Sequence, residues 1–273
     1  MIDVLLPHLE LRPFIRGYIH NVIDFSRESL NNTYFFTPTH KKFIMLYLGS
    51  SVEVTFENKK KEKKKDMLII GPQTTPVSLC FESNHRLIAI ELQNIGQYYL
   101  LGGCPIHTLI DSHLEGDAVF GNPVKELIDK LIETNDLEKI KKELDQFFLK
   151  ILNRNKLKTN RSDMLLNELP QNIPIAAMAL AAGRSVRQLE RLFKDRIGVS
   201  PKFFRKLRRF ATAYKIKELN PNQTWTQIAY SCGYFDQMHL IKDFKTFLGH
   251  NPSYINQLLN QQYQEYTNYQ IPQ

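Results

Sequence analysis

Apolar and polar residues in the first hundred positions follow the pattern of β-strands. Val52, Val54 and Phe56 alternate with polar neighbours, which predicts a half-buried strand. Other strands are predicted from continuous apolar runs at 43–48, 67–70, 77–81 and 86–92. Several short strands separated by Gly and Pro predict a small antiparallel barrel or sandwich between Tyr34 and Leu92. Before it, residues 1–20 predict a short helix or an arm.

After Gly121 the apolar spacing becomes that of helices. Asn122 and Pro123 predict the start of one helix, and Asp136 predicts the cap of a second. Both helices carry wide apolar stripes of Leu, Ile, Val and Phe. Such stripes either cover the β-domain or form a dimer seam, and the pattern favours neither. The polar and basic residues that follow have no apolar period, so we expect an interdomain linker at 156–162.

Residues 173–255 contain one pattern twice, at an offset of 50 or 51 residues. In each copy a short Ala-containing apolar stretch ends at a Gly, which fits the left-handed residue that closes a helix. Ser185 and Asp236 then predict the N-caps of two amphipathic helices. This order predicts two helix-turn-helix units. A helix at 201–219 would join them, and its length of roughly 28 Å is near the ~34 Å between successive major-groove faces of DNA.

Positive charge is concentrated in this repeat. Residues 171–260 hold 14 Lys and Arg against 5 Asp and Glu, whereas the rest of the chain holds 22 against 23, within a net charge of +8. A basic module on an otherwise neutral protein indicates a polyanionic partner. A second basic run, with six lysines between 59 and 65, has no interleaved Arg or aromatic residue. It favours a solvated hairpin tip over a nucleic-acid contact.

The exposed side chains of the two second helices are candidates for DNA contact, against the alternative of a merely solvated helix face. Arg and Gln match donor and acceptor pairs on base edges, whereas Lys mostly meets phosphate. We expect base-facing positions at Arg187, Gln188, Arg191, Gln237, Met238, His239, Ile241 and Lys242. We expect phosphate contacts from Arg184, Lys194, Lys206, Arg209 and Lys245. The first helix is richer in Arg, so we expect it to contribute more of the sequence-specific affinity.

The stretch Ile228–Gln237, with Phe244-Lys245, Gly249 and Pro252-Ser253-Tyr254, carries a family resemblance. Through it, residues 172–258 resemble the DNA-binding domain of the AraC/XylS family of bacterial transcription regulators. The resemblance implies seven helices, with 201–219 as the linker helix. It also implies base-facing roles for Arg187, Glu190, Arg191, Gln237, Met238 and Lys242. Val186, Met238 and Leu240 depart from the residues usual at their positions and leave the operator sequence open.

Residues 1–155 resemble the sensory domains of the same family through 68–73 and 88–121. That resemblance implies a cupin-like β-barrel with dimerisation helices, a role in effector sensing, and dimerisation. The expected fold class is therefore α+β, with an all-α C-terminal domain of two helix-turn-helix units at 163–260 and a tail at 261–273. Aromatic residues that either line a barrel pocket or form its packed core are Tyr34, Phe36, Phe43 and Tyr47.

These patterns predict a sequence-specific, ligand-responsive transcription regulator. Its expected partners are double-stranded DNA, a small-molecule effector, a second copy of the chain and, for an activator, RNA polymerase. Neither a cofactor, a metal cluster nor catalytic residues are expected, because the histidines lack ligand spacing and no nucleophile or phosphate motif is present. Three scattered cysteines and the lack of a signal peptide or membrane-spanning run predict a cytoplasmic protein. The alternatives are an architectural DNA-binding protein without an effector and a cupin-type enzyme recruited to DNA.

Overall fold

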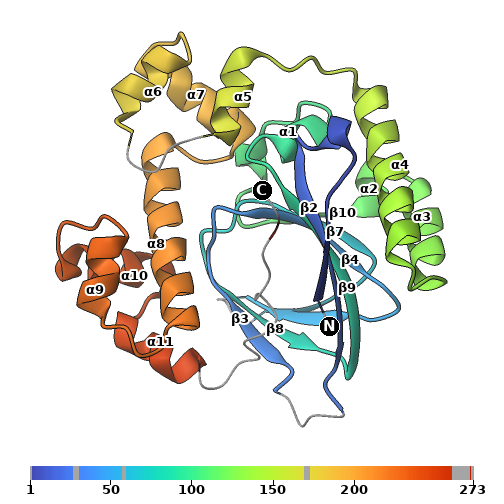
Figure 1. Ribbon diagram of the computed structural model, residues 1–273, viewed down its shortest axis with the longest axis horizontal. Helices are drawn as coiled ribbons and strands as arrows, with labels where there is room; N and C mark the ends of the chain where they lie inside the picture. The colour runs from blue at the N-terminus through green and yellow to red at the C-terminus, as the bar shows by residue number, and fades with distance from the viewer. Residues whose placement is uncertain (1, 27–30, 57–59, 169–172, 260–270, 272–273) are drawn as a thin grey trace.

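A computed structural model describes residues 2–26, 31–56, 60–168, 173–259 and 271 (Figure 1). The fold is α+β, as predicted, with an N-terminal β-rich domain and a C-terminal helical part. One sheet has the strand order β1 (Ile2–Leu5), β2 (Ile15–Asp24), β9 (Asn84–Leu92), β4 (Lys42–Tyr47), β7 (Met67–Ile70) and β10 (His113–Glu115). The other has the order β3 (Thr33–Phe36), β8 (Val77–Phe81), β5 (Val52–Thr55) and β6 (Lys61–Lys64). All these neighbouring strands pair antiparallel.

The larger sheet is buried on both faces, and strand β4 shows why its sequence is continuously apolar. Phe43, Met45 and Tyr47 point into the core between the two sheets. Ile44 and Leu46 belong to a second core on the opposite face, where helices pack. A strand covered on both sides needs apolar residues at every position, so the run lacks the usual alternation.

Helices α3 (Pro123–Ile132) and α4 (Leu137–Asn155) supply much of that second core. Their apolar stripes, which include Leu127, Leu131, Leu144 and Phe148, are buried within the chain. Of the two interpretations left open for these stripes, the structure favours the cover of the sheet. As predicted, Pro123 occupies the first turn of α3, and Asp136 caps α4 by accepting from the backbone N–H of the second and third helical residues.

Two sequence predictions about strands were wrong. Residues 1–20 were expected to form a short helix or an arm, but Ile2–Leu5 is β1 and residues 15–20 belong to β2, whose buried two-sided pattern hides the strand period. The lysine run was assigned to a hairpin tip, yet Lys61–Lys64 is β6, an edge strand of the smaller sheet. Lysines on an edge strand discourage pairing with other chains, and Lys61 and Lys63 form ion pairs with Glu53 and Glu82. Lys59 lies outside the described residues.

Short helices complete the N-terminal domain, and seven helices follow in the described part of the chain. The short ones are η1 (Leu9–Leu11), α1 (Gly96–Leu100), η2 (Ile106–Leu109) and α2 (Gly116–Phe120). The seven are α5 (Arg161–Asn167), α6 (Ile175–Ala181), α7 (Val186–Arg196), α8 (Pro201–Leu219), α9 (Trp225–Ser231), α10 (Gln237–Leu248) and α11 (Pro252–Leu259). Helix α8 has the predicted bounds and carries α6–α7 at one end and α9–α11 at the other (Figure 1).

The two helix-turn-helix units are attached differently to the rest of the molecule. Leu189, Phe193 and Ile197 of the first unit belong to the same core as α1, α3 and α4. The second unit has a separate core with α8, built around Phe210 and Phe244. The first unit is therefore docked on the N-terminal domain, and the second reaches it chiefly through α8.

Buried polar groups hold the carboxyl end of α7 against the N-terminal domain. The guanidinium of Arg196 donates to Asp163 Oδ1 at 3.0 Å, and the hydroxyl of Tyr99 donates to Asp163 Oδ2 at 2.5 Å. Lys42 Nζ donates to the carbonyls of Asn94 and Arg196 at 2.8 and 3.2 Å. Burial lowers the pKa of the Lys42 ammonium to about 7. These contacts join β4, α1, α5 and α7 at one point.

We call the region where α7 contacts the N-terminal domain the seat of the first unit. Gly198, two residues after the end of α7, also lies in it. Its φ of +101° lies in the region that favours glycine, and a Cβ there would lie 2.5 Å from Pro72 Cγ and 3.0 Å from Ile106 Cγ2. A side chain would therefore push the first unit away from the loop after β7 and from η2.

The predicted linker at 156–162 overlaps the stretch between helices α4 and α5. Helix α4 ends at Asn155, and α5 begins at Arg161, within the linker predicted at 156–162. Apart from Ile271, the tail predicted at 261–273 lies outside the described residues. In the described part of the chain, no helix has the length and apolar character needed to cross a membrane.

Candidate nucleic-acid interface

The first recognition helix, α7, begins with a complete capping box. Gly183 adopts a φ of +62°, as predicted for the residue that turns the chain between the helices. Ser185 Oγ accepts from the N–H of Gln188 at 3.2 Å, and Gln188 Oε1 accepts from the N–H of Ser185 at 2.9 Å. The Gln188 side chain, predicted to face the bases, thus turns back onto the helix start. A base contact from Gln188 would require this capping interaction to open.

The second recognition helix, α10, begins in a related but less symmetric way. Gly233 has a φ of +73°, and Asp236 is the N-cap, as predicted. One carboxylate oxygen of Asp236 accepts from the backbone N–H of His239 and contacts its ring Nδ1, both at 2.8 Å. These hydrogen bonds keep the pKa of Asp236 below its usual range. The side chain of Gln237 is held by Thr226 of α9 at 3.0 Å.

Most of the predicted contact residues are exposed on these two helices. In the first unit the exposed ones are Arg184, Arg187, Gln188, Glu190, Arg191 and Lys194. In the second they are Gln237, Met238, His239, Lys242 and Lys245, while Ile241 is half-buried. In both units, the side chains at the amino-terminal end of the recognition helix are therefore exposed. This is the end at which a helix-turn-helix contacts base edges.

Two of the predicted phosphate-binding residues are instead engaged inside the domain. Arg209 lies over the ring of Tyr234 at 4.0 Å and forms an ion pair of 2.7 Å with buried Asp243. Lys206 lies 3.6 Å from the same carboxylate and donates to Thr246 at 3.0 Å. Both side chains tie α8 to α10, so phosphate would have to compete with Asp243 for them.

A basic groove between the two units includes residues that the sequence interpretation did not place in the site. Lys202, Arg205 and Arg208 of α8 line it together with Lys206 and Arg209. The feature that could have identified them is the density of Lys and Arg along 202–209. A groove with this many cations suits a phosphate backbone passing from one unit to the other.

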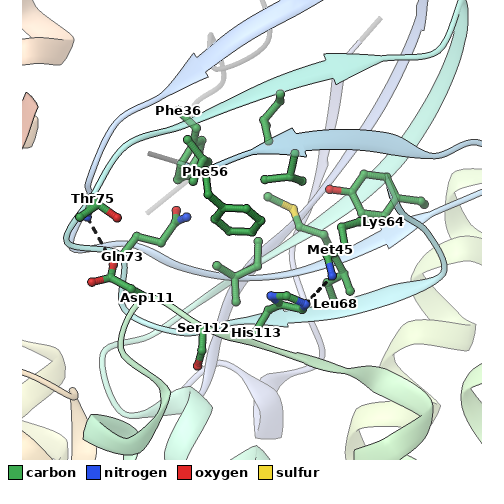
Figure 2. Close-up of a pocket in the computed structure, with 15 residues that line it drawn as sticks. Phe36, Met45, Phe56, Lys64, Leu68, Gln73, Thr75, Asp111, Ser112 and His113 are labelled. Carbon is green, nitrogen blue, oxygen red and sulfur yellow. Dashed lines mark hydrogen bonds between the residues drawn. The ribbon is translucent and has the colours of Figure 1, made fainter. Parts of the chain in front are cut away.

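A second candidate site is an apolar pocket between the two sheets (Figure 2). Its wall is formed by side chains of both sheets, which include Phe36, Met45, Tyr47, Phe56, Leu68 and Val77. Of the four aromatics left open by the sequence, Tyr34, Phe43 and Tyr47 belong to the core between the sheets, and Tyr47 and Phe36 also line this pocket.

Polar side chains gather at the mouth of this pocket. Lys64 Nζ lies 2.6 Å from His113 Nε2 (Figure 2). It also lies 2.6 Å from a carboxylate oxygen of Glu62. Burial and the neighbouring ammonium lower the pKa of His113. Asp111 accepts from the N–H groups of Thr74 and Thr75 nearby. The pocket thus combines an apolar interior with a polar rim.

Comparison with known proteins identifies the C-terminal part. Residues 178–257 match the sequence model of the family described as Helix-turn-helix domain. This confirms the predicted helix-turn-helix domain, which the resemblance to AraC/XylS regulators implied. No protein of curated function matches the chain.

Several solved structures are similar to this chain at low sequence identity. ToxT from Vibrio cholerae O395, bound to (E)-4-(8-methylnaphthalen-1-yl)but-3-enoic acid, has 17% identity and a TM-score of 0.47, over 89% of this chain and 99% of that one. ToxT from Vibrio cholerae strain SCE256, bound to an unsaturated fatty acid, has 14% identity and a TM-score of 0.44, over 87% and 94%. The AraC-like transcriptional activator CuxR has 13% identity and a TM-score of 0.27, over 78% and 86%.

Proposed function

We propose that this chain, whose residues 178–257 form a helix-turn-helix domain, is a sequence-specific DNA-binding transcription regulator. The observation that carries the proposal is the exposure of two recognition helices at equivalent positions of a basic repeat. A single helix of this kind is often only a solvated surface. Two of them, joined by one 19-residue helix whose groove is lined by cations, form a surface suited to duplex DNA.

We assign base contacts to the exposed side chains at the start of each recognition helix. In the first unit these are Arg187, Glu190 and Arg191, and Gln188 is left to its capping role. In the second unit they are Gln237, Met238, His239, Ile241 and Lys242. Phosphate contacts are assigned to Arg184, Lys194 and Lys245, with the α8 groove between the units contributing further charge.

The effector of the proposed regulator would bind in the pocket between the sheets. Its apolar interior and the ammonium of Lys64 at its mouth favour a small apolar molecule with one acidic or hydrogen-bond-accepting group. The pocket shares a wall with the seat of α7. Gln73 and Asp111 line it, Pro72 accepts from the N–H of Asp111 at 2.9 Å, and Pro72 also lies against Gly198. A ligand that moves this wall would therefore move the first recognition helix.

A homodimer and a contact with RNA polymerase belong to the proposal as implications of the AraC/XylS resemblance. Because the apolar stripes of α3 and α4 are used within the chain, a dimer would use the outer, mostly charged faces of these helices. Such a surface suits a modest, salt-sensitive association.

The test is a competition between selected and random DNA. The full-length protein first selects duplexes from a random library, and the best duplex then competes with scrambled duplex at physiological salt. We expect preference for the selected duplex by about 10³-fold or more. Arg191→Ala should relax preference at particular positions, whereas Lys61→Ala, an equal change of charge on strand β6, should leave DNA binding unchanged. Equal binding of selected and scrambled duplexes would exclude a sequence-specific regulator and favour an architectural protein.

A further inference from the structure

The two recognition helices differ in chemistry at equivalent positions of the repeat. The pairs that the 51-residue offset brings into correspondence are Arg184 with Phe235, Arg187 with Met238, and Glu190 with Ile241. Three charged side chains of the first unit are thus replaced by three apolar side chains in the second. A spacing of three residues keeps these positions close to one side of the helix start. The second unit therefore presents an apolar strip where the first presents charges.

The two most exposed side chains of this strip lie outside the described hydrophobic cores. Phe235 is 84% exposed and Met238 is 59% exposed. An apolar residue directly before an N-cap often packs on the fourth residue of the helix, which here is the fully buried Leu240. The exposure of Phe235 excludes that role, and its ring lies at a steep angle to that of His239, with centroids 6.0 Å apart. Adjacent exposed apolar side chains of this size indicate a contact outside the chain.

The place of the strip favours a base edge as that contact. Residues at the amino-terminal end of a recognition helix enter the major groove, where base edges carry hydrogen-bonding groups and one apolar group, the C5-methyl of thymine. We propose that Phe235 and Met238 are specificity-determining residues that contact thymine methyl groups in the half-site of α10. Beside them, exposed Gln237 carries an amide of the type that pairs with adenine, the partner of thymine, and that pairing requires its hydrogen bond from Thr226 to open. This inference rests on the proposed DNA-binding function and adds the base type that the second unit selects.

Deoxyuracil provides the direct test, because it lacks only the C5-methyl group and pairs as thymine does. The full-length protein selects its best duplex from a random library, and each thymine of that duplex is then replaced singly by deoxyuracil. Affinities are measured by fluorescence anisotropy at one salt concentration. In the half bound by α10 we expect one or two positions where deoxyuracil weakens binding about fourfold, the effect of burying one methyl-sized group. Replacements in the half bound by α7 should change affinity less than twofold.

Substitutions then connect the effect to the residues. Phe235→Ser and Met238→Ser should each weaken binding to the thymine duplex and abolish the difference between thymine and deoxyuracil at one position. Leu180→Ser, which removes an equally exposed apolar side chain from α6, should leave that difference unchanged.

The outcomes separate this inference from the function on which it rests. Failure to select any duplex would exclude the regulator itself. A selected duplex that binds equally well with thymine and deoxyuracil throughout would overturn only the methyl contact. Variants that weaken both duplexes equally would overturn it too, since the loss would then come from backbone contacts or folding. Variants that bind both as the wild type does would assign the apolar strip to a protein partner instead.

Discussion

Gly198 and Gly249 occupy equivalent positions after the two recognition helices, and replacing each with alanine isolates the seat of the first unit. Both have positive φ, +101° and +71°. At Gly249 no described atom lies within 4 Å of an added Cβ, so Gly249→Ala adds only backbone strain of about 1–2 kcal/mol. At Gly198 the added Cβ also meets Pro72 at 2.5 Å and Ile106 at 3.0 Å, and overpacking of this kind costs about 1–3 kcal/mol more.

Urea unfolding of the full-length variants measures the difference. Far-UV circular dichroism follows the whole chain, and the fluorescence of Trp225, the single tryptophan, follows the second unit. We expect Gly198→Ala to lower the free energy of unfolding by about 1–3 kcal/mol more than Gly249→Ala does. Gly249→Ala should shift the Trp225 transition more than the remainder of the signal. Equal losses from the two variants, by both probes, would refute the docking of the first unit on the N-terminal domain.

Three further predictions concern ionisable side chains. Burial lowers the pKa of His85 to about 4 from 6.5, so the unfolded chain binds an extra proton below pH 6.5. Stability should therefore fall by about 2 kcal/mol between pH 7 and 5 from this group, and His85→Met should remove that part of the slope in urea titrations. The pKa of Lys42, lowered to about 7 from 10.5, acts in the pH range above 7. The unfolded chain keeps the proton there while the folded chain loses it, so stability should rise by about 2 kcal/mol from pH 7 to 9, and Lys42→Met should abolish the rise. An unchanged slope in either variant would contradict the assignment of that group. Lys64→Met should weaken binding of an apolar acid by roughly tenfold or more, but it should leave binding of the methyl ester of that acid unchanged. Thermal-shift titrations with both compounds measure this, and equal losses of affinity for the two would exclude a charge contact.

Much of the fold follows from the sequence because local chemistry decides it. Strands β7 and β8 and helix α8 have the predicted bounds, since apolar runs end at turn residues or at Pro221. The caps Ser185 and Asp236 were also predicted, because each precedes an amphipathic run. In these places the residue types that form an element lie within the element itself.

The features that were missed depend on distant partners. Strand β2 has apolar residues toward both faces because helices and a second sheet cover it, and its sequence alone does not reveal those layers. The Gln188 side chain was expected to face the bases, but it closes the capping box. Asp243 draws Lys206 and Arg209 away from solvent across more than 30 residues of chain. Pairings of this kind are set by tertiary packing and have no local pattern.

In the proposed complex, one chain reads two successive major-groove segments with α7 and α10. The most direct measurement is the affinity for the selected duplex after insertion of base pairs between its two halves. Five inserted base pairs turn the second half to the opposite side of the duplex, about half a helical turn away. Affinity should then fall to that of the α7 half-site alone. Arg191→Ala should abolish specific binding to the altered duplex, while Met238→Ser should have no further effect. An insertion that leaves affinity unchanged would show that the two units do not read one face of the duplex together.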